Sequence, residues 1–268
     1  MKLKNMTRFA PVAALFFIGT VGLTSCKKEV VVEGTSSDFL EVSETNSSFL
    51  AKHTGTWCGP CGGWGFTNFQ SQIDTYGDSE VNIAVVSGSL GAGANNEYFF
   101  DAFANALSIS ATPTFHGNLG QTTSGQLVTD HQSSAVVANS NYEVTIADGK
   151  INVKTTTKFF QDLSGEDYYI APYIIVDGIV ANQAGHPDGA NTIHKKSLVD
   201  IATPVGLDDK AFGYKVASGD IRAGYRVNLE AEADFNSAWT EDQVSVAILI
   251  TKRDANGNPV FVNAFTKH

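Results

Sequence analysis

Two cysteines are spaced so that their sulfurs could form and break a disulfide bond. Residues 56–61 read T-W-C-G-P-C, which places Cys58 and Cys61 two residues apart. If a helix begins here, its N–H groups and dipole favour a thiolate at the first cysteine. A thiolate attacks a client disulfide, and a second thiol then releases the product from the mixed disulfide. We therefore assign Cys58 as the nucleophile and Cys61 as the resolving thiol.

The same spacing has two other uses. The pair could be an inert structural disulfide, because C-x-x-C alone is a short motif. It could also belong to a zinc site, but zinc needs two more ligands, and without a second C-x-x-C these would have to come from nitrogens such as those of His53 and His116. We expect no metal and no other cofactor. A reactive first cysteine should be partly exposed, whereas a structural pair should be buried.

The flanking residues predict the elements that would position the cysteines. Residues 49–51 begin a short apolar strand that runs into the C-G-P-C turn. A helix should follow, because Phe66, Phe69 and Ile73 recur at helical spacing. The motif is thus predicted to lie between the end of a strand and the start of a helix.

Further elements are expected before residue 139. Residues 81–86, V-N-I-A-V-V, are typical of a buried strand, and residues 95–107 carry apolar side chains on one side of a helix. A strand should follow Pro113, with residues 126–128 as its partner strand. A capping-box pattern predicts that a last helix opens at Thr129. The expected order is βαβαββα.

The motif, its flanking elements and a later proline together resemble the thioredoxin family. Thr112-Pro113 lies about fifty residues after the cysteines, just before a predicted strand. In that family a cis-proline at the matching place lies beside the disulfide and presents backbone to the substrate, so the resemblance implies that Pro113 is cis and acts with Cys58 and Cys61. The alternative is an ordinary trans proline at the entry of a strand. We expect four neighbours of the disulfide to contact substrate: Trp57, Gly59, Pro60 and Thr112.

One position departs from that family's pattern. Thioredoxins carry a buried acid six positions before the first cysteine, which is thought to help deprotonate the resolving thiol, and this chain has Lys52 there. A nearby cation would favour the Cys58 thiolate and make the disulfide more oxidising. A lysine that points to solvent would have no such effect. The direction of exchange therefore stays open.

The second half of the chain changes to a period of two. Apolar residues alternate with polar neighbours after about residue 139, and Asp148-Gly149 and Asn256-Gly257 are typical hairpin turns. Many short strands and no convincing helix favour a β-sandwich. The predicted fold class is α/β plus all-β, with a thioredoxin-like domain over residues 48–139 followed by an Ig-like β-sandwich over residues 140–268.

The N-terminus predicts export and lipid attachment. A basic stretch precedes an apolar run over residues 11–23, which is typical of a signal peptide and too short to span a membrane. The run ends L-T-S-C at Cys26, which resembles the lipobox of bacterial lipoproteins, a family cut before a cysteine that then carries lipid. We expect residues 1–25 to be removed and residues 26–47 to form a lipidated tether. The alternative is an ordinary secretory signal with an unrelated cysteine.

Composition and charge narrow the class of protein. The 268 residues are 43% hydrophobic and 17% charged, which suits a packed globular core. A net charge of -10 makes nucleic acid a poor partner. We expect a lipid-anchored protein of the bacterial cell envelope, with the outer membrane favoured and its face undetermined. Its expected partners are protein thiol or disulfide clients, a redox partner and, through the lipid, the membrane.

The lipobox, the W-C-x-x-C domain and the C-terminal strands together resemble the Omp-twenty-eight-related family of outer-membrane lipoproteins. Its members commonly carry T-G-x-W-C-x-x-C after a strand, which residues 54–61 match. Residues 173–183 and 259–264 also resemble its C-terminal region. The resemblance implies an envelope location and a thioredoxin-like fold, and it names no substrate.

Two functions fit these observations. The leading hypothesis is an envelope-anchored thiol–disulfide oxidoreductase, and the alternative is a non-enzymatic binding lipoprotein with a static disulfide. Two loops add little to this choice. Residues 185–194 contain two histidines and an aspartate, but the many turn formers favour a solvated loop over a ligand site. Residues 254–258 resemble a calcium loop without its distal glutamate, and are interpreted as a hairpin.

Overall fold

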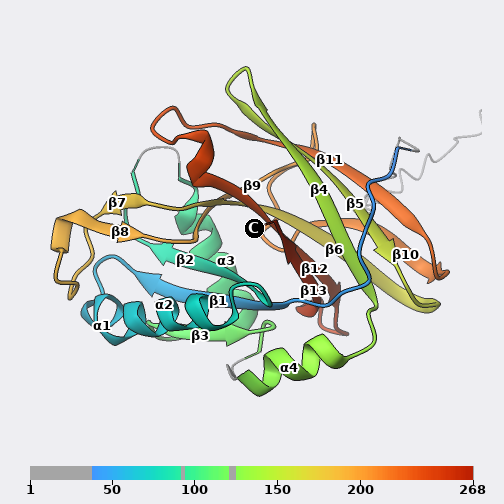
Figure 1. The fold of residues 1–268 in the computed structure, drawn as a ribbon, viewed down its shortest axis with the longest axis horizontal. Coiled ribbons are helices and arrows are strands. Elements are labelled where there is room, and N and C mark those ends of the chain that lie inside the picture. The colour runs from blue at the N-terminus through green and yellow to red at the C-terminus, as the bar shows by residue number, and fades with distance from the viewer. Residues whose placement is uncertain (1–37, 92–93, 121–124, 268) are drawn as a thin grey trace, which may run out of the picture.

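One eight-stranded mixed sheet runs through the molecule in the computed structural model, which describes residues 38–91, 94–120 and 125–267 (Figure 1). Its strands are β1 (Ser48–Gly55), β2 (Glu80–Ser87), β3 (Thr114–Gly117), β6 (Leu163–Val176), β9 (Ser197–Ile201), β10 (Tyr214–Ile221), β12 (Val244–Arg253) and β13 (Pro259–Thr266). The strand order is β13-β12-β6-β9-β2-β1-β3, and β10 also pairs with β6. The sheet therefore joins strands from both halves of the chain.

Smaller elements surround this sheet. A three-stranded sheet has the order β11-β5-β4, and β7 pairs with β8 in a separate hairpin. These strands are β4 (Ala138–Ala147), β5 (Lys150–Phe159), β7 (Ile179–Ala181), β8 (Thr192–His194) and β11 (Arg226–Asp234). The helices are α1 (Gly59–Gly62), α2 (Trp64–Tyr76), α3 (Asn96–Leu107) and α4 (Gly125–Ser133), with 3-10 turns η1 (Gly189–Asn191) and η2 (Glu241–Gln243). The hairpin and α1 lie at one end of the molecule, and β4, β5, β10 and β11 at the other (Figure 1).

Strand β1 is buried along its whole length between two helices. It pairs in parallel with β2 and antiparallel with β3. Lys52 lies over Phe66 and Phe69 of α2, whereas His53 stacks on Phe100 of α3. Because successive side chains of a strand point to opposite faces, α2 and α3 cover opposite faces of the sheet. The C-G-P-C turn follows directly from the end of this rigidly held strand.

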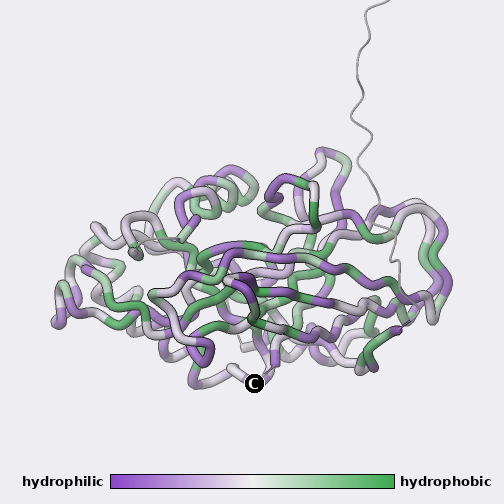
Figure 2. Tube along the Cα trace, turned by 90° about the horizontal axis from the view of Figure 1, so that it is seen from above, coloured by the Kyte–Doolittle hydropathy of each residue, from purple (hydrophilic) through white to green (hydrophobic). Residues whose placement is uncertain are grey.

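The two larger sheets share one hydrophobic core. Phe159 of β5 meets Tyr168 of β6 edge-on, with ring centroids 5.1 Å apart. Tyr142 of β4 meets Phe265 of β13 in the same way at 5.8 Å. Hydrophobic segments alternate with hydrophilic ones along the outer strands (Figure 2), as expected where one face of a strand is packed and the other is solvated.

The fold corrects one local prediction. Residues 126–128 belong to α4 and are not a strand. This helix begins at Gly125, four residues before the predicted start, and the Thr129 hydroxyl donates back to the Gly125 carbonyl at 2.9 Å. The strand prediction rested on two adjacent apolar residues, which are too few to show a period of two. The Gln126 side chain donates to Asp130 four residues later, a spacing that supports the helix.

The second half of the chain differs from a separate sandwich. Strands β6, β9, β10, β12 and β13 all belong to the sheet that contains β1, β2 and β3. The strand pairing that joins the two halves of the sheet is short. Strands β2 and β9 pair in parallel only at Ala84 and Ser197. The observed class is thus mixed α/β with one large sheet and extra strands, and the predicted sandwich is not confirmed. The domain boundary at residue 139 stays a prediction and falls just after β4 begins at Ala138.

The predicted signal peptide, the lipid site at Cys26 and the first part of the tether lie outside the described residues. Residues 38–45 lie against the three-stranded sheet, whereas Asn46 and Ser47 contact α4 and β13. The Leu40 amide donates to the Thr156 hydroxyl at 2.9 Å, and the Asn139 side chain donates to the Ser43 carbonyl at 3.0 Å. Within the described ranges, no helix has the length and apolar character needed to cross a membrane.

Candidate functional site

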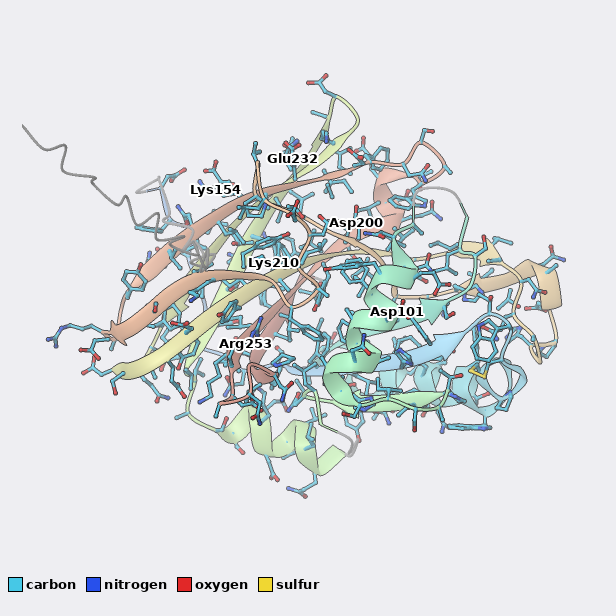
Figure 3. All side chains as sticks on the ribbon, turned by 180° about the vertical axis from the view of Figure 1, so that it is seen from behind. Asp101, Lys154, Asp200, Lys210, Glu232 and Arg253 are labelled. Atoms are coloured by element: carbon cyan, nitrogen blue, oxygen red, sulfur yellow. A yellow bond between two sulfur atoms is a disulfide. The ribbon has the colours of Figure 1, made fainter. Side chains whose placement is uncertain are left out.

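The two cysteines form a disulfide at the N-terminus of α1. Cys58 is the N-cap residue, in an extended conformation with φ −87° and ψ 111°. The Cys61 amide donates to the Cys58 sulfur at 3.2 Å, and the S–S bond is 2.08 Å long. Figure 3 shows this bond at one end of the molecule, away from Lys154 and Glu232. The first cysteine therefore lies where helix N–H groups would favour a thiolate in the reduced protein.

The Thr112–Pro113 peptide bond is cis and lies beside the disulfide. The Cys58 sulfur is 3.6 Å from the Thr112 carbonyl oxygen. Gly65 of α2 makes room for the proline ring, because a Cβ atom there would lie only 2.7 Å from Pro113 Cγ. The structure thus brings Cys58 against Thr112 and Pro113, which lie more than fifty positions later in the sequence.

The sulfurs are more buried than expected for a reactive pair. Cys58 is 5% exposed and Cys61 is fully buried. Their neighbours are exposed: Trp57 is 63% exposed and Trp64 is 53% exposed. By the exposure criterion the disulfide resembles a structural pair, whereas its position at a helix N-terminus beside a cis-proline suits exchange.

The predicted substrate-contacting residues form the accessible surface around the disulfide. Pro60 is exposed, and Gly59 and Thr112 are partly exposed. The indole N–H of Trp57 donates to the Ser87 hydroxyl at 3.3 Å, and its ring lies against Gly55, where a Cβ would be 2.8 Å from the ring. The Trp57 ring is therefore held in place and still faces solvent.

A residue of the second half of the chain, which the sequence did not mark, binds the C-G-P-C turn. Gln183 is 1% exposed and follows β7. Its side-chain amide donates to the carbonyl oxygens of Gly55 at 3.0 Å and Cys58 at 3.1 Å. The next residue, Ala184, donates its backbone N–H to the Thr56 carbonyl at 2.7 Å. The only sequence signal in residues 173–183 was their resemblance to a family. Nothing in that stretch predicts which carbonyl oxygens the Gln183 side chain would bind.

The loop after Gln183 packs against the backbone of the motif. A Cβ at Gly62 would lie 2.2 Å from the Ala184 carbonyl oxygen, and one at Gly185, which has φ +77°, would lie 2.1 Å from the Gly59 carbonyl oxygen. His186 contacts Phe66 of α2 with ring centroids 4.4 Å apart. The loop was predicted to be solvated, and Gly185 is indeed exposed, but the start of the loop also packs against the backbone of the C-G-P-C turn.

Lys52 does not point to solvent. It is 4% exposed, and its ammonium lies 5.1 Å and 5.3 Å from the ring centroids of Phe66 and Phe69. Burial lowers the pKa of Lys52 from 10.5 to about 8. Burial also lowers the pKa of His194, and the charge of Lys52 adds to this effect. The position that holds an acid in thioredoxins therefore holds a buried lysine here, whose pKa lies closer to neutral pH than that of an exposed lysine.

The two histidines considered as metal ligands lie against α3 and the end of the sheet. His53 Nε2 is 3.0 Å from the Phe100 carbonyl oxygen, and burial lowers the pKa of this histidine. His116 on β3 is also buried, which lowers its pKa in the same direction. Across residues 38–91, 94–120 and 125–267, the structure brings no three His, Cys, Asp or Glu side chains together in a way that could hold a metal ion.

Comparison with known proteins rests on structure. No protein-family model matches the sequence, and no curated protein matches it. HBP35 of Porphyromonas gingivalis has a similar structure, with a TM-score of 0.69, 16% identity, and coverage of 85% of this chain and 76% of that chain. Protein AGR_C_4864 from Agrobacterium tumefaciens has a TM-score of 0.49 and 12% identity over 84% of this chain and 95% of its own.

The likeness to HBP35 shows the fold, and at this identity it shows nothing about activity. The fold and the site define a mixed α/β protein with a C-x-x-C disulfide at the start of a helix. The order of β1, the C-x-x-C turn, α2, β2 and a cis-proline before β3 is consistent with the expected thioredoxin-like arrangement.

Proposed function

We propose that this protein is a thiol–disulfide oxidoreductase that exchanges disulfides with protein clients through Cys58 and Cys61. The observation that carries the proposal is the position of the Cys58 sulfur at the N-terminus of α1, 3.6 Å from the carbonyl oxygen that precedes the cis-proline. An extended client segment could pair with backbone at Thr112 while its disulfide meets Cys58. Such pairing would bring a client sulfur to the attacking thiolate.

The exchange follows from the two thiols. In the reduced protein, the Cys58 thiolate attacks one sulfur of a client disulfide, and the client S–S bond breaks as the other client sulfur leaves and takes up a proton. The Cys61 thiolate then attacks the Cys58 sulfur of the mixed disulfide and releases the second client thiol. The client gains two electrons, and the protein is left with its Cys58–Cys61 disulfide. A redox partner that carries a dithiol would reduce this disulfide again.

Other residues assist recognition in this proposal. The exposed rings of Trp57 and Trp64 offer apolar surface to client segments. The strands after residue 139 are proposed to serve as a recognition or scaffolding module with an Ig-like sandwich arrangement. Support for that arrangement comes from the aromatic contacts of β4 with β13 and of β5 with β6.

The location is part of the same proposal. We place the protein among the Omp-twenty-eight-related lipoproteins of the bacterial envelope, anchored through lipid on Cys26. The L-T-S-C sequence and the T-G-x-W-C-x-x-C motif support this placement. Labelling cells with a fatty-acid analogue should mark the wild-type protein and leave Cys26→Ser unlabelled. Equal labelling of both would refute the lipid anchor.

A second candidate function has its own observation. Cys58 is 5% exposed, and Gln183 and Gly185 hold the turn from behind. A buried, clamped disulfide suits a binding lipoprotein in which the bond is static. Under this alternative, the protein would bind its partners without exchanging electrons.

Trapping distinguishes the two candidates. In a Cys26→Ser background, Cys61→Ser should accumulate mixed disulfides with envelope proteins, because the resolving thiol is missing. Cys58→Ser should accumulate none, and it serves as the matched control because it retains one thiol of the pair. Absence of trapped clients with Cys61→Ser, in cells where the variant is folded and exported, would favour the static disulfide.

A further inference from the structure

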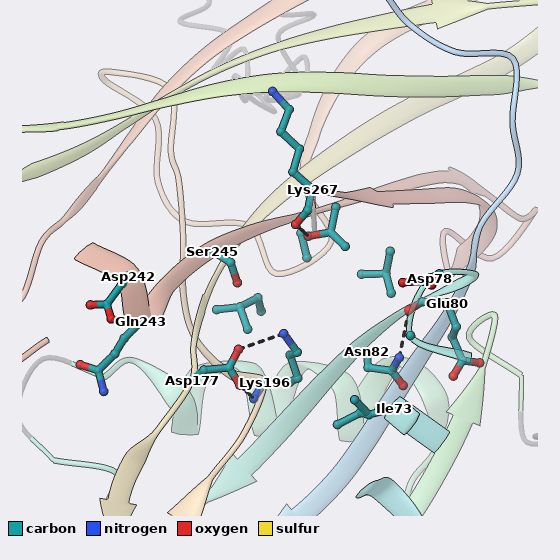
Figure 4. A pocket seen from close by; sticks show the side chains of 15 residues that line it. Ile73, Asp78, Glu80, Asn82, Asp177, Lys196, Asp242, Gln243, Ser245 and Lys267 are labelled. Carbon is teal, nitrogen blue, oxygen red and sulfur yellow. Dashed lines mark hydrogen bonds and ion pairs between the residues drawn. The ribbon is translucent and has the colours of Figure 1, made fainter. Parts of the chain in front are cut away.

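A polar cleft lies on the large sheet, well apart in the fold from the C-G-P-C turn. It has a volume of about 350 Å³ and lies between the C-terminal end of α2 and strands β6, β12 and β13 (Figure 4). Small-molecule sites usually measure ~300–1,000 Å³, so the cleft is large enough for a small ligand. Residues from both halves of the chain line the cleft, because β2 and β12 both contribute to its wall.

Two buried acceptors line this cleft without a partner. Glu80 is 4% exposed and Asn82 is 7% exposed. Among the residues that the structure describes, Glu80 Oε2 and Asn82 Oδ1 find no hydrogen-bond donor. The Asn82 side-chain N–H is already used, because it donates to the Glu80 carbonyl at 2.9 Å. Buried polar atoms are nearly always hydrogen-bonded, so this pair calls for a ligand that donates.

Carboxylate side chains lie at both ends of the cleft. Asp78 joins Glu80 beside the end of α2, and Asp177 and Asp242 lie on the other side (Figure 4). Between these ends the wall is mixed: Ile73, Val81, Ile175 and Ala247 give it apolar surface, and Lys196, Ser245 and Thr266 give it polar groups. A ligand that fits this pattern carries positive donors at its ends and an aliphatic middle.

The lysines of the cleft already have partners. Lys196 donates to the Asp177 carboxylate at 2.9 Å. The Lys267 ammonium donates to the carbonyl of Tyr142 and so turns away from the acidic end at Glu80 (Figure 4). Neither ammonium therefore meets the two unpartnered acceptors.

We propose that this cleft binds a short aliphatic diamine as its dication, with one ammonium against Glu80 and Asn82 and the other toward Asp242. An ammonium supplies both the hydrogen-bond donors and the charge that the buried acceptors lack. A divalent metal ion fits less well, because no three acidic, histidine or cysteine side chains of the described residues converge on one point.

The proposal carries a pH dependence. Burial raises the pKa of Glu80 from 4.5 to about 7. A bound ammonium favours the ionised carboxylate, so affinity should rise by up to about tenfold between pH 6 and pH 8, as the ionised fraction of a group with a pKa near 7 rises. The other charged groups that line the cleft are Asp78, Asp177, Lys196, Asp242 and Lys267.

Calorimetric titration with putrescine tests the site, with 1,4-butanediol as a neutral ligand of matched length. We expect saturable putrescine binding that is stronger at pH 8 than at pH 6, and no binding of the diol. Glu80→Gln should weaken putrescine binding by about tenfold or more and remove its pH dependence. Glu230→Gln, which removes the same charge from the exposed part of β11, should leave binding unchanged.

Each other outcome overturns the proposal. Equal binding of the diol would show a site for hydroxyl donors and not for ammonium. Equal loss in Glu230→Gln would show non-specific attraction to an acidic protein. Absence of heat with putrescine at both pH values would leave water as the partner of Glu80 and Asn82.

Discussion

Replacing Lys52 by methionine should stabilise the protein at neutral pH. Lys52 lies buried between β1 and α2, and its pKa falls from 10.5 to about 8 because burial penalises the charged form. Methionine fills a similar space, and its flexible apolar side chain suits contact with Phe66 and Phe69. The substitution removes the cost of burying a charge.

The magnitude follows from the pKa. One pKa unit corresponds to about 1.4 kcal/mol, so a fall from 10.5 to about 8 corresponds to about 3 kcal/mol of unfolding free energy. Loss of the two cation–π contacts with Phe66 and Phe69 offsets part of this, at about 0.5–1 kcal/mol each. We expect Lys52→Met to be about 1–3 kcal/mol more stable than the wild type at pH 7.

The sign of the pH dependence is fixed by which state binds more protons. Between pH 8 and pH 10.5 the unfolded chain holds the Lys52 proton and the folded chain releases it, so the wild type gains stability as pH rises. The advantage of Lys52→Met should therefore shrink across this range and be largely absent above it.

Denaturation by urea at several pH values measures this directly. The oxidised protein should be used, because disulfide-bonded cysteines do not titrate in the same range. Lys195→Met is a matched control, because Lys195 lines the same small cavity as Lys52, is exposed, and donates to the Gln70 side chain. A stability difference for Lys52→Met that does not change with pH, or that equals the difference for the control, would refute the reasoning.

Three further substitutions test the surroundings of the disulfide. Gln183→Leu leaves two buried carbonyls of the C-G-P-C turn without their donor. It should lower the unfolding free energy by about 1–3 kcal/mol and speed reduction of the disulfide by dithiothreitol. Unchanged values would show that the Gln183 hydrogen bonds have no energetic role. Gly185→Ala should destabilise the protein by more than about 1 kcal/mol in a melt, because its φ is +77° and its Cβ would meet the Gly59 carbonyl; a wild-type melt would contradict this close contact. Trp57→Ala removes an exposed ring, so stability should change by less than about 1 kcal/mol while the rate of exchange with a peptide disulfide falls severalfold; an unchanged rate would exclude the ring from client binding.

The sequence supported the local prediction around the cysteines because short-range patterns determine it. The strand before the motif and the helix after it are both present. The cis peptide bond at Pro113 is present too, but it was implied by the resemblance to thioredoxins and not by a local pattern. Gly65 is a poor helix former, yet its missing side chain is what lets the proline ring approach α2. The error at residues 126–128 has a local cause too, since that run is too short to show a period.

Contacts between residues far apart in the chain could not be predicted from the sequence. Gln183 lies 125 residues from Cys58, and nothing in its neighbourhood marks the carbonyl that it binds. Alternation predicts strands and does not choose their partners, so the continuation of the sheet from β2 to β9 could not be inferred. The burial of Lys52 could not be predicted either, because a lysine in a strand is usually solvated.

The reduction potential of the Cys58–Cys61 disulfide tests the central claim most directly. The Cys26→Ser protein would be equilibrated with thiol buffers of known potential, and its dithiol and disulfide forms separated after quenching. The proposed exchange predicts a potential between about -270 mV and about -120 mV, the range of dithiol oxidoreductases from thioredoxin to strong oxidants. A disulfide far below about -300 mV would be a structural bond, and the static-disulfide function would then hold.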